Sequence, residues 1–332
     1  MMNLRQPGLH RGVLRVAMLG SALSFGLQAA PGHAADFPAK PITLVVAYAP
    51  GGLGDALART IAERLTVSLK QPVLVGNKPG ATGAIATRFV AKANPDGYTL
   101  LLGQTGEIAI NTAVMKDPGY DPLRELKAVA LVGDSPLVLA APPNSPFATV
   151  REIAQFAGRG NVTSYASSGT ATPGHLSAET MLGALKTPMT HVPYKGAGPA
   201  LTDVLGGHVA FFFSSAGATF GHIKAGKLKA IAVSSSARIS ALPNTPAVAE
   251  TLPGFAFGLW GGVFAPVATP AEVIALLNRE INNVLLEPAA KQKIEDLGAI
   301  VRTVTPDEFA RFVASETTKY QQLVKQIGIK PE

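Results

Sequence analysis

The stretch Leu44-Val-Val-Ala-Tyr-Ala-Pro-Gly-Gly-Leu-Gly-Asp55 contains the pattern that decides the fold. Its apolar first half is typical of a buried parallel strand, and its second half is a glycine-rich turn. A helix is predicted from Asp55 onward, because apolar side chains recur there at helical spacing: Leu57, Ile61, Leu65 and Leu69. Such a turn presents free backbone N–H groups at the positive end of a helix dipole. The segment therefore predicts a strand, a turn and a helix that together can seat an anion.

The N-terminal residues 1–34 have the composition of a secretory signal. Its three parts follow in order: the basic residues Arg5, Arg11 and Arg15, the apolar run Val16–Leu27, and the small-residue cleavage motif Gly32-His-Ala34. The apolar run has 12 positions, whereas about 20 are needed to span a bilayer. We therefore expect a Sec signal peptide, cleavage after Ala34 and a soluble protein in the periplasm.

Charge and cysteine content exclude several classes of function. Cleavage would lower the formal net charge from +7 to +4, and no basic stripe interleaved with aromatic residues is present, so we expect no nucleic-acid partner. The chain has no cysteine. Disulfides, thiol catalysis, thiolate metal sites and a lipid anchor on an N-terminal cysteine are therefore excluded.

Strand-like and helix-like segments alternate along the chain, which predicts an α/β fold with two parallel-rich sheets covered by helices. Strands are expected at 42–48, 73–76, 99–103, 162–166, 189–192, 209–213, 228–234 and 259–265. Helices are expected from 55 onward and at 83–93, 149–157, 175–185, 199–205, 271–286 and 306–327. The last helix opens with Thr305-x-x-Glu308, a capping box, and carries a stripe of apolar residues expected to pack on the sheet.

Two crossings of the chain, near 133–137 and 255–259, divide this pattern into two lobes. At the first crossing, two apolar runs between 128 and 141 flank the turn-like segment Gly133-Asp-Ser-Pro136. We expect residues 35–135 and 258–332 to form lobe 1 and residues 136–257 to form lobe 2. A clamshell with a hinge of two crossings is typical of solute receptors that close around their ligand.

Four turns follow apolar strands and are rich in glycine, serine, threonine and other small residues: 49–55, 104–107, 167–174 and 214–217. In open α/β sheets, ligands bind beyond the carboxyl ends of the strands, where all four turns are expected. Ordinary turn and cap chemistry would explain any one of them. Because four turns share this place, we expect them to bind a ligand.

Motifs of catalysis are missing from the sequence. No G-x-G-x-x-G, G-x-x-x-x-G-K-[ST] or H-E-x-x-H motif occurs, and the mature chain has no G-x-S-x-G. We expect His175 and His222 to cap or pack, Asp55 to cap its helix, and Trp260 to pack at the hinge. No catalytic residue, metal or cofactor is expected. A periplasmic hydrolase that uses a serine of 164–170 with His175 is the less favoured alternative.

A set of ordered motifs resembles the substrate-binding proteins of tripartite tricarboxylate transporters, also called Bug receptors. The resemblance runs from Phe37 to about Gly328. Its landmarks are Pro38-Ala-Lys-Pro-Ile42, Ala49-Pro-Gly-Gly52, Gln71-Pro-Val73, Asn77-Lys-Pro-Gly80, Pro95-Asp-Gly-Tyr-Thr-Leu100, Ala109-Ile-Asn111, Tyr120-Asp-Pro122, His191-Val-Pro-Tyr-Lys-Gly196, Ala200-Leu-Thr-Asp203, Gly221-His-Ile-Lys-Ala-Gly-Lys227 and Leu242-Pro-Asn-Thr-Pro246. Any one motif alone is weak, whereas the ordered set is specific.

The resemblance implies a type II periplasmic binding protein that closes like a Venus flytrap and has no catalytic activity. It implies a small carboxylate ligand, a di- or tricarboxylate or an aromatic carboxylate, delivered by a monomer to a permease with a large and a small subunit. A receptor for a membrane sensor kinase is the alternative. Carried over, the site residues are Tyr48, Ala49, Gly51, Gly52, Gly54, Asp55, Thr105, Glu107, Ser167, Ser168, Gly169, Thr170, Tyr194, Ser214 and Ser215, with Lys195 beside Tyr194 at the pocket wall.

The chain departs from the family pattern at three positions. Ser214 stands where aspartate is common, so we expect the distal pocket to tolerate a neutral, aromatic or second carboxylate group. Glu107 stands where a small polar or neutral residue is usual, and it would favour a cationic group if it faced the pocket. Leu53 replaces a threonine in the first turn and removes one hydroxyl.

Overall fold

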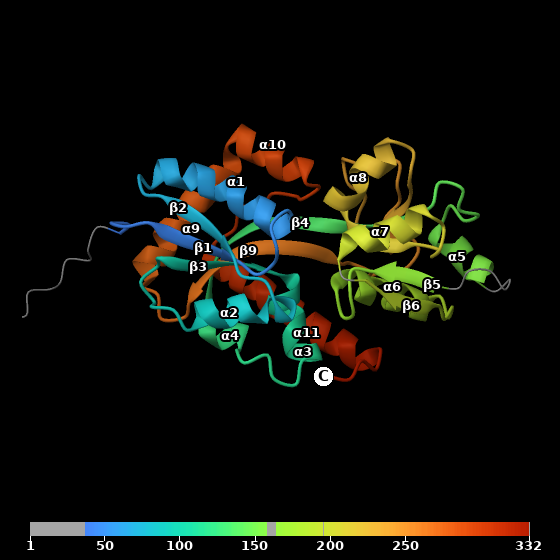
Figure 1. Cartoon of the computed structure of the whole chain (residues 1–332), viewed down its shortest axis with the longest axis horizontal. Helices are drawn as coiled ribbons and strands as arrows, with labels where there is room; N and C mark the ends of the chain where they lie inside the picture. The colour runs from blue at the N-terminus through green and yellow to red at the C-terminus, as the bar shows by residue number, and fades with distance from the viewer. Residues whose placement is uncertain (1–36, 158–163, 195, 332) are drawn as a thin grey trace, which may run out of the picture. The chain divides into compact units, whose positions relative to one another are not determined.

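The computed structural model describes residues 37–157, 164–194 and 196–331. From Phe37 onward the chain forms one compact α/β unit (Figure 1). The predicted signal peptide, residues 1–34, lies outside the described residues.

The first group of strands places the glycine-rich turn at the edge of a sheet. Strand β1 (Ile42–Val46) lies between β2 (Val73–Asn77) and β3 (Thr99–Gln104) and is parallel to both. The order continues with β9 (Gly258–Pro266) and β4 (Leu126–Ala141), and β9 is antiparallel to both of its neighbours. Because β1 and β3 run the same way, the turns that follow them lie at the same edge.

The second group of strands is built on the far half of β4. There β4 pairs in the antiparallel sense with β7 (Phe212–Ser215) and β8 (Lys229–Val233). Strand β5 (Ser164–Ser167) is parallel to β7 and to β6 (Thr190–Pro193). Each group is half parallel and half antiparallel, whereas the sequence predicted parallel-rich sheets. All four antiparallel pairs among the described strands involve β4 or β9: β9 pairs with β3 and β4 in the first group, and β4 pairs with β7 and β8 in the second.

The two lobes are joined by β4 and β9, which lie side by side (Figure 1). Strand β4 is continuous through residues 133–136, where the sequence predicted the first crossing between the lobes. Its pairing with β9 ends at Pro136, opposite Gly258, and its pairing with β7 begins at Leu137. A strand accommodates Pro136 here because proline interrupts a ladder of hydrogen bonds, and this is where one ladder gives way to the next.

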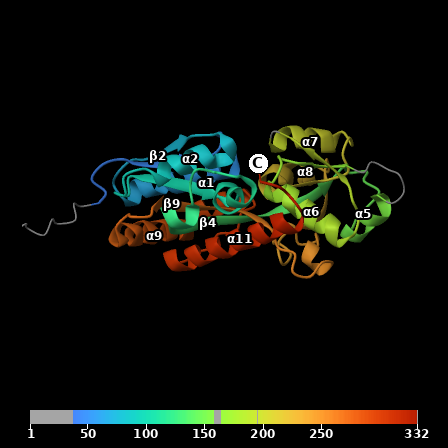
Figure 2. The same ribbon diagram turned by 90° about the horizontal axis from the view of Figure 1, so that it is seen from below.

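Helices cover both faces of the first group. One face packs against α1 (Leu53–Ser68), α9 (Ala271–Leu286) and α10 (Pro288–Asp296), and the other against α2 (Ala84–Ala91) and α11 (Pro306–Gln326) (Figure 1). Figure 2 shows the long helix α11 alongside β4. The capping box predicted for α11 is confirmed: Thr305 Oγ1 accepts the Glu308 N–H and Glu308 Oε2 accepts the Thr305 N–H. Sequence analysis missed α10, although Pro288 at its start is a common first helical residue.

The other helices of the described residues belong to the connections and to lobe 2. They are the 3-10 turns η1 (Ala81–Gly83) and η3 (Val248–Glu250), the π-helix η2 (Gly106–Ile110), and the α-helices α3 (Asn111–Val114), α4 (Pro122–Glu125), α5 (Val150–Ala157), α6 (Pro173–Ala184), α7 (Ala197–Leu205) and α8 (Ala216–Lys224).

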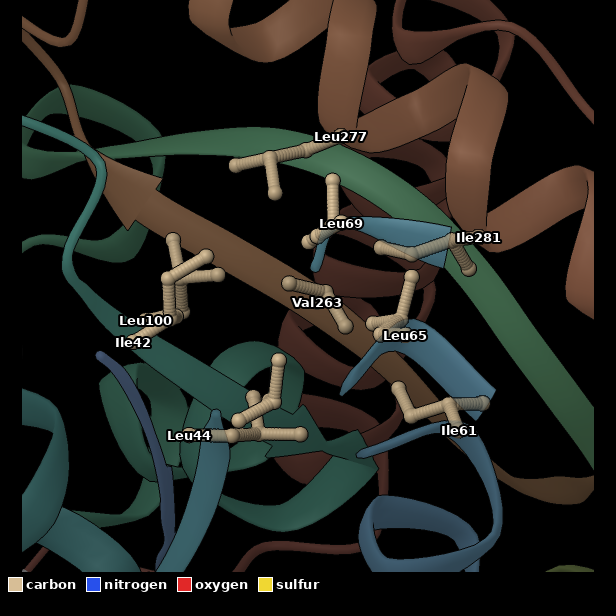
Figure 3. A pocket seen from close by; sticks show the side chains of 10 residues that line it. Ile42, Leu44, Ile61, Leu65, Leu69, Leu100, Val263, Leu277 and Ile281 are labelled. Carbon is tan, nitrogen blue, oxygen red and sulfur yellow. The ribbon is translucent and has the colours of Figure 1, made fainter. Parts of the chain in front are cut away.

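A small void between α1, α9 and the first sheet is part of the core. Figure 3 shows its lining of aliphatic side chains, which include Leu44, Ile61 and Leu277. Its volume is about 10 Å³, less than one water molecule needs. It therefore cannot hold a ligand, and the site must be sought at the ends of the strands.

Candidate functional site

The turn after β1 has the geometry of an anion seat. Gly51 has φ of +90°, a left-handed conformation that favours glycine, and Gly52 is the N-cap of α1. The first helical hydrogen bond runs from the Ala56 N–H to the Gly52 carbonyl. The N–H groups of residues 53–55 therefore have no partner among the described residues, and they point along the positive end of a 16-residue helix.

Asp55 holds this turn in shape. Its Oδ2 accepts the Gly51 N–H at 3.1 Å and Arg59 Nε at 3.0 Å, and its Oδ1 accepts Asn77 Nδ2 at 2.9 Å. The Arg59 guanidinium and the Gly51 amide lower the pKa of the Asp55 carboxyl below its usual range, against the effect of burial. Asp55 was predicted to cap its helix, which is wrong, because Gly52 is the cap and Asp55 lies in the first turn.

Replacing Asp55 by alanine is expected to lower the free energy of unfolding by about 2 kcal/mol, since a buried amide and a peptide N–H lose their acceptor. Urea denaturation monitored by circular dichroism measures the change. Arg59→Ala is the matched control, because Arg59 is more than half exposed and an exposed ion pair contributes less than about 1 kcal/mol. An equal loss in both variants would contradict the assignment of Asp55 as the organiser of the turn.

Glu107 lies beneath this turn and is fully buried. Its Oε1 accepts the Gln104 N–H at 2.7 Å, and its Oε2 accepts the Tyr48 hydroxyl at 2.8 Å. Tyr120 donates to the Glu107 carbonyl at 2.6 Å. Burial raises the pKa of Glu107 to about 7, although both donors favour its charged form. Glu107 therefore supports Tyr48 from below and faces the interior.

Thr105 also faces the interior. Its Oγ1 accepts the Trp260 N–H at 2.9 Å, which ties the end of β3 to β9. Trp260 is fully buried and donates its indole N–H to Glu316 at 3.1 Å, so the prediction that it packs at the hinge is confirmed. The expected loop at Thr105–Glu107 is the start of the π-helix η2 instead. The buried Glu107 side chain folds back onto Gln104, whose N–H it accepts.

The turn after β5 resembles the first one. It leads into α6, whose N-cap Thr172 accepts the His175 N–H. Backbone bonds from the Tyr194 N–H to the Ser167 carbonyl and from the Gly196 N–H to the Ser168 carbonyl hold it against the segment after β6. Ser168 is half-buried and Thr170 exposed, and their hydroxyls have no partner among the described residues. These two hydroxyls are therefore available to a ligand.

Ser167 is buried and belongs to a packed histidine cluster. Its Oγ lies 2.6 Å from His191 Nε2, and the rings of His191 and His175 stack with centroids 3.8 Å apart. Burial lowers the pKa of each histidine to about 4, so both are neutral at pH 7. His175 Nδ1 accepts the Ala171 N–H at 3.0 Å, so its predicted packing role is confirmed.

This cluster lacks the parts of a serine hydrolase. The serine of this cluster, Ser167, is buried. Its partner is His191, whereas the predicted hydrolase would use His175. Glu179 lies 3.9 Å from His175 Nε2. Among the described residues, no carboxylate lies within ion-pair distance of His191, and Glu179 acts on it only from farther away. Among the described residues, no group of three or more metal-ligating side chains could hold a metal ion.

The other predicted site residues lie along lobe 2. Tyr194 donates its hydroxyl to Asp203, and partial burial with that bond raises its pKa to about 12. Ser215 is the N-cap residue of α8. Ser214 is buried, and its Oγ has no hydrogen-bond partner among the described residues. Lys195, predicted at the pocket wall, lies outside the described residues.

The predicted residues therefore form two clusters. Around Tyr48 and the first turn, Asn77 is a partner that sequence reasoning did not assign: it bonds both the Tyr48 carbonyl and Asp55. Around the second turn, the unassigned partner is His191. Asn77 is the last residue of β2, and His191 lies within β6, the strand beside β5. A polar residue in a strand that neighbours an assigned turn is the signal that could have found them.

Comparison with known proteins places the chain. The family model for the tripartite tricarboxylate transporter family receptor matches residues 57–329. The chain belongs to this receptor family. Protein BugT of Bordetella pertussis is 36% identical over 318 residues, which covers 95% of this chain and 98% of BugT. The predicted membership of the tripartite tricarboxylate transporter (Bug) receptors is thereby confirmed.

Solved structures confirm the two-lobe periplasmic-binding-protein fold of this receptor. The periplasmic binding protein BugD superposes with a TM-score of 0.78 at 32% identity, covering 89% of this chain and all of BugD. Rpa4515 of R. palustris, solved with adipate, gives 0.82 at 32% identity, covering 90% of this chain and all of Rpa4515. MatC of Rhodopseudomonas palustris, solved with bound malate, gives 0.77 at 31%, covering 87% of this chain and all of MatC.

Among the described helices of the receptor, none combines the length and apolar character needed to cross a bilayer.

Proposed function

We propose that this receptor binds one small carboxylate between its two lobes in the periplasm and delivers it to a tripartite permease with a large and a small subunit. The observation that carries the proposal is the seat at residues 51–55, where three free N–H groups meet a helix N-terminus. The relatives solved with adipate and malate hold dicarboxylates. The predicted signal peptide, residues 1–34, supports the location.

The two clusters divide the ligand between them. One carboxylate accepts charge-assisted bonds from the amides after Gly52, in a turn that Tyr48 and Asp55 hold in place. Ser168, Gly169 and Thr170 approach from lobe 2, which spans residues 136–257, when the hinge closes. The free hydroxyl of Ser214 accommodates the distal end of the ligand. Because a neutral serine stands there, a second carboxylate, an aromatic group or a neutral group is accepted.

The same geometry supports a role without catalysis. The hydroxyl next to an imidazole, that of Ser167, is buried and belongs to the packing of lobe 2. Glu107 faces the interior, so it does not select a cationic ligand. A receptor that signals to a membrane sensor kinase would use the same site, and transport assays separate the two roles.

A thermal-shift screen of the receptor from residue 35 onward tests the proposal. The panel contains adipate, malate, citrate, terephthalate, glutamate and their amides. A ligand raises the melting temperature in proportion to the logarithm of its concentration, by mass action. We expect acids of one class to stabilise the receptor and the matching amides to have no effect. No shift from any acid, in protein shown by mass spectrometry to be free of bound ligand, would overturn the proposal.

The double variant Ser168→Ala and Thr170→Ala removes the two free hydroxyls of lobe 2. It is expected to bind the best acid of the panel at least tenfold more weakly than the wild type. Each hydroxyl bond to a carboxylate contributes about 1.5–3 kcal/mol. Isothermal titration calorimetry gives the affinity, and the melting temperature of the ligand-free protein should be unchanged. The double control, Ser236→Ala and Thr303→Ala, removes exposed hydroxyls elsewhere. Equal affinities in both double variants would refute this placement.

A further inference from the structure

Helix α2 buries one face, and its exposed face combines large apolar and basic side chains. Ala86, Thr87 and Val90 are fully buried. The outward stripe has the spacing i, i+3, i+4, i+7 and consists of Ile85, Arg88, Phe89 and Lys92. Ile85 is 41% exposed and Phe89 is 48% exposed, which places them among the few large apolar side chains that the described surface presents. With Lys78 from the segment after β2, these four residues form what we call the α2 face.

All the charged residues of the α2 face are positive. Lys78 Nζ lies 4.7 Å from the centre of the Phe89 ring, so it holds its charge over the aromatic surface. Arg88 is fixed by its bond to the Ala84 carbonyl and by contact with Gly119. Among the described residues, neither Lys78, Arg88 nor Lys92 forms an ion pair. The three cations therefore lack an acidic partner within the described part of the chain.

A groove runs along this face. Its volume is about 560 Å³, and the α2 face lines it together with Ala93 and Asn94. No acidic side chain belongs to the lining. An occupant must therefore bring carboxylates for the cations and an apolar side chain for Ile85 and Phe89. Arginine and aromatic residues of this kind are enriched at protein interfaces, where they contribute most of the binding energy.

The same helix contacts the candidate ligand site at its N-terminus. The Thr82 carbonyl, one turn before α2, accepts Asn111 Nδ2 at 3.0 Å and the Tyr48 hydroxyl at 3.4 Å. A Cβ placed on Gly83 would lie 2.9 Å from the Cβ of Glu107, so α2 packs directly on the residue that supports Tyr48. The helix that carries the α2 face therefore packs against the candidate ligand site.

We propose that the α2 face is the docking surface for an acidic segment of the membrane permease, one that presents an apolar side chain between carboxylates. The proposal rests on the proposed function, which supplies the permease. Charge complementarity selects an acidic partner. The groove favours a peptide over an anionic lipid surface, because a flat bilayer meets the cations without filling the space between Ile85 and Phe89.

The test uses a triple charge reversal, Lys78→Glu, Arg88→Glu and Lys92→Glu. The matched control makes the same change in net charge at exposed lysines on other elements, with Lys224→Glu, Lys227→Glu and Lys330→Glu. A milder variant, Lys78→Glu with Lys92→Glu, leaves the Arg88 contacts intact in case the triple variant loses stability. Binding is measured to the large and small permease subunits reconstituted together in phosphatidylcholine nanodiscs, at 50 and 500 mM NaCl.

The wild-type receptor is expected to bind the permease nanodiscs and to weaken at high salt, because screening reduces the attraction. The triple and double variants should bind at least tenfold more weakly, while the control triple variant should match the wild type. The proposal is overturned if the α2 variants bind the permease as the wild type does. It is also overturned if the wild-type receptor binds vesicles of phosphatidylcholine and phosphatidylglycerol that contain no permease and the α2 variants lose this binding.

The failure of this proposal can be told apart from failure of the proposed function. Ligand affinity of each variant is measured separately by calorimetry with the best acid of the panel. Wild-type affinity with lost permease binding supports the α2 face. If no acid binds the wild type, the receptor proposal fails, yet the permease-binding comparison between the α2 variants and their control still decides the docking surface.

Discussion

Replacing Glu107 by glutamine is expected to raise the free energy of unfolding at alkaline pH by about 3 kcal/mol relative to the wild type, with no such gain at acidic pH. The pKa of Glu107 is about 7 in the folded protein and 4.5 in the unfolded chain, and one pKa unit corresponds to about 1.4 kcal/mol. The folded state therefore binds this proton more tightly. Its contribution to stability is fully present below pH 4.5 and is lost as the pH rises through 7.

The glutamine substitution preserves the contacts of the neutral acid. Its amide oxygen can accept the Gln104 N–H, and its NH₂ group can donate to Tyr48, whose own hydrogen then turns to the Thr82 carbonyl. The variant should fold normally and lack only the charged form. Burial of a neutral amide with both bonds made has little cost, whereas burial of the carboxylate is what raises the pKa.

Urea unfolding at pH 4.5, 6, 7 and 8 measures this difference. The comparison between proteins matters because the buried histidines His175 and His191 act in the opposite sense: their pKa of about 4 lies below the unfolded value, so they favour folding as the pH rises from 4 to 6.5. Glu272→Gln, an exposed residue in the first turn of α9, is the control. A parallel pH profile for Glu107→Gln and the wild type would refute the raised pKa.

Replacing Gly174 by alanine is expected to destabilise the receptor by about 3 kcal/mol, the upper end for overpacking of a tight interior. A Cβ at Gly174 would lie 2.3 Å from the Phe213 carbonyl oxygen. That atom belongs to the backbone of β7 and cannot move aside as a flexible side chain would. The start of α6 must shift away from the sheet, and it carries the turn of Ser168 and Thr170 with it, so ligand affinity should fall as well.

The same helix supplies the control. Gly183 lies near the other end of α6, and a Cβ there meets nothing within 4 Å. Gly183→Ala should raise stability by about 0.5–1 kcal/mol, because alanine loses less conformational entropy in a helix than glycine. Thermal unfolding by calorimetry should therefore move in opposite directions for the two variants. Equal melting temperatures would show that α6 does not pack on β7 as described.

In the proposed function, the described residues that favour a carboxylate do so through the backbone of the first turn. Backbone N–H groups at a helix start carry fixed partial charge and need no desolvation of a counter-ion when the ligand arrives. The charged residues near the first turn, Asp55 and Glu107, are used to hold the turn and Tyr48 in place. The proposed function leaves selectivity for the rest of the ligand to lobe 2, where Ser214 is neutral.

The sequence by itself determined the parts whose signals are local. The strand, glycine turn and helix at residues 42–68, the capping box at Thr305 and the apolar stripe of α11 depend on spacings of two to four residues, and the structure has them all. The ordered motifs also identified the family, which the match to residues 57–329 confirmed. Such signals survive in any tertiary context because backbone geometry alone sets their period.

The tertiary structure alone decided which way the polar residues face. Glu107 and Tyr48 are 59 residues apart and Thr105 and Trp260 are 155 apart, so no local pattern shows that they bond. The same holds for the stacking of His175 on His191 and for the passage of β4 between the two groups of strands. A polar side chain after a strand looks alike in sequence whether it meets a ligand or a buried partner. The difference is made by the distant segment that packs against it, because a buried polar group needs a hydrogen-bond partner and only the folded chain supplies one.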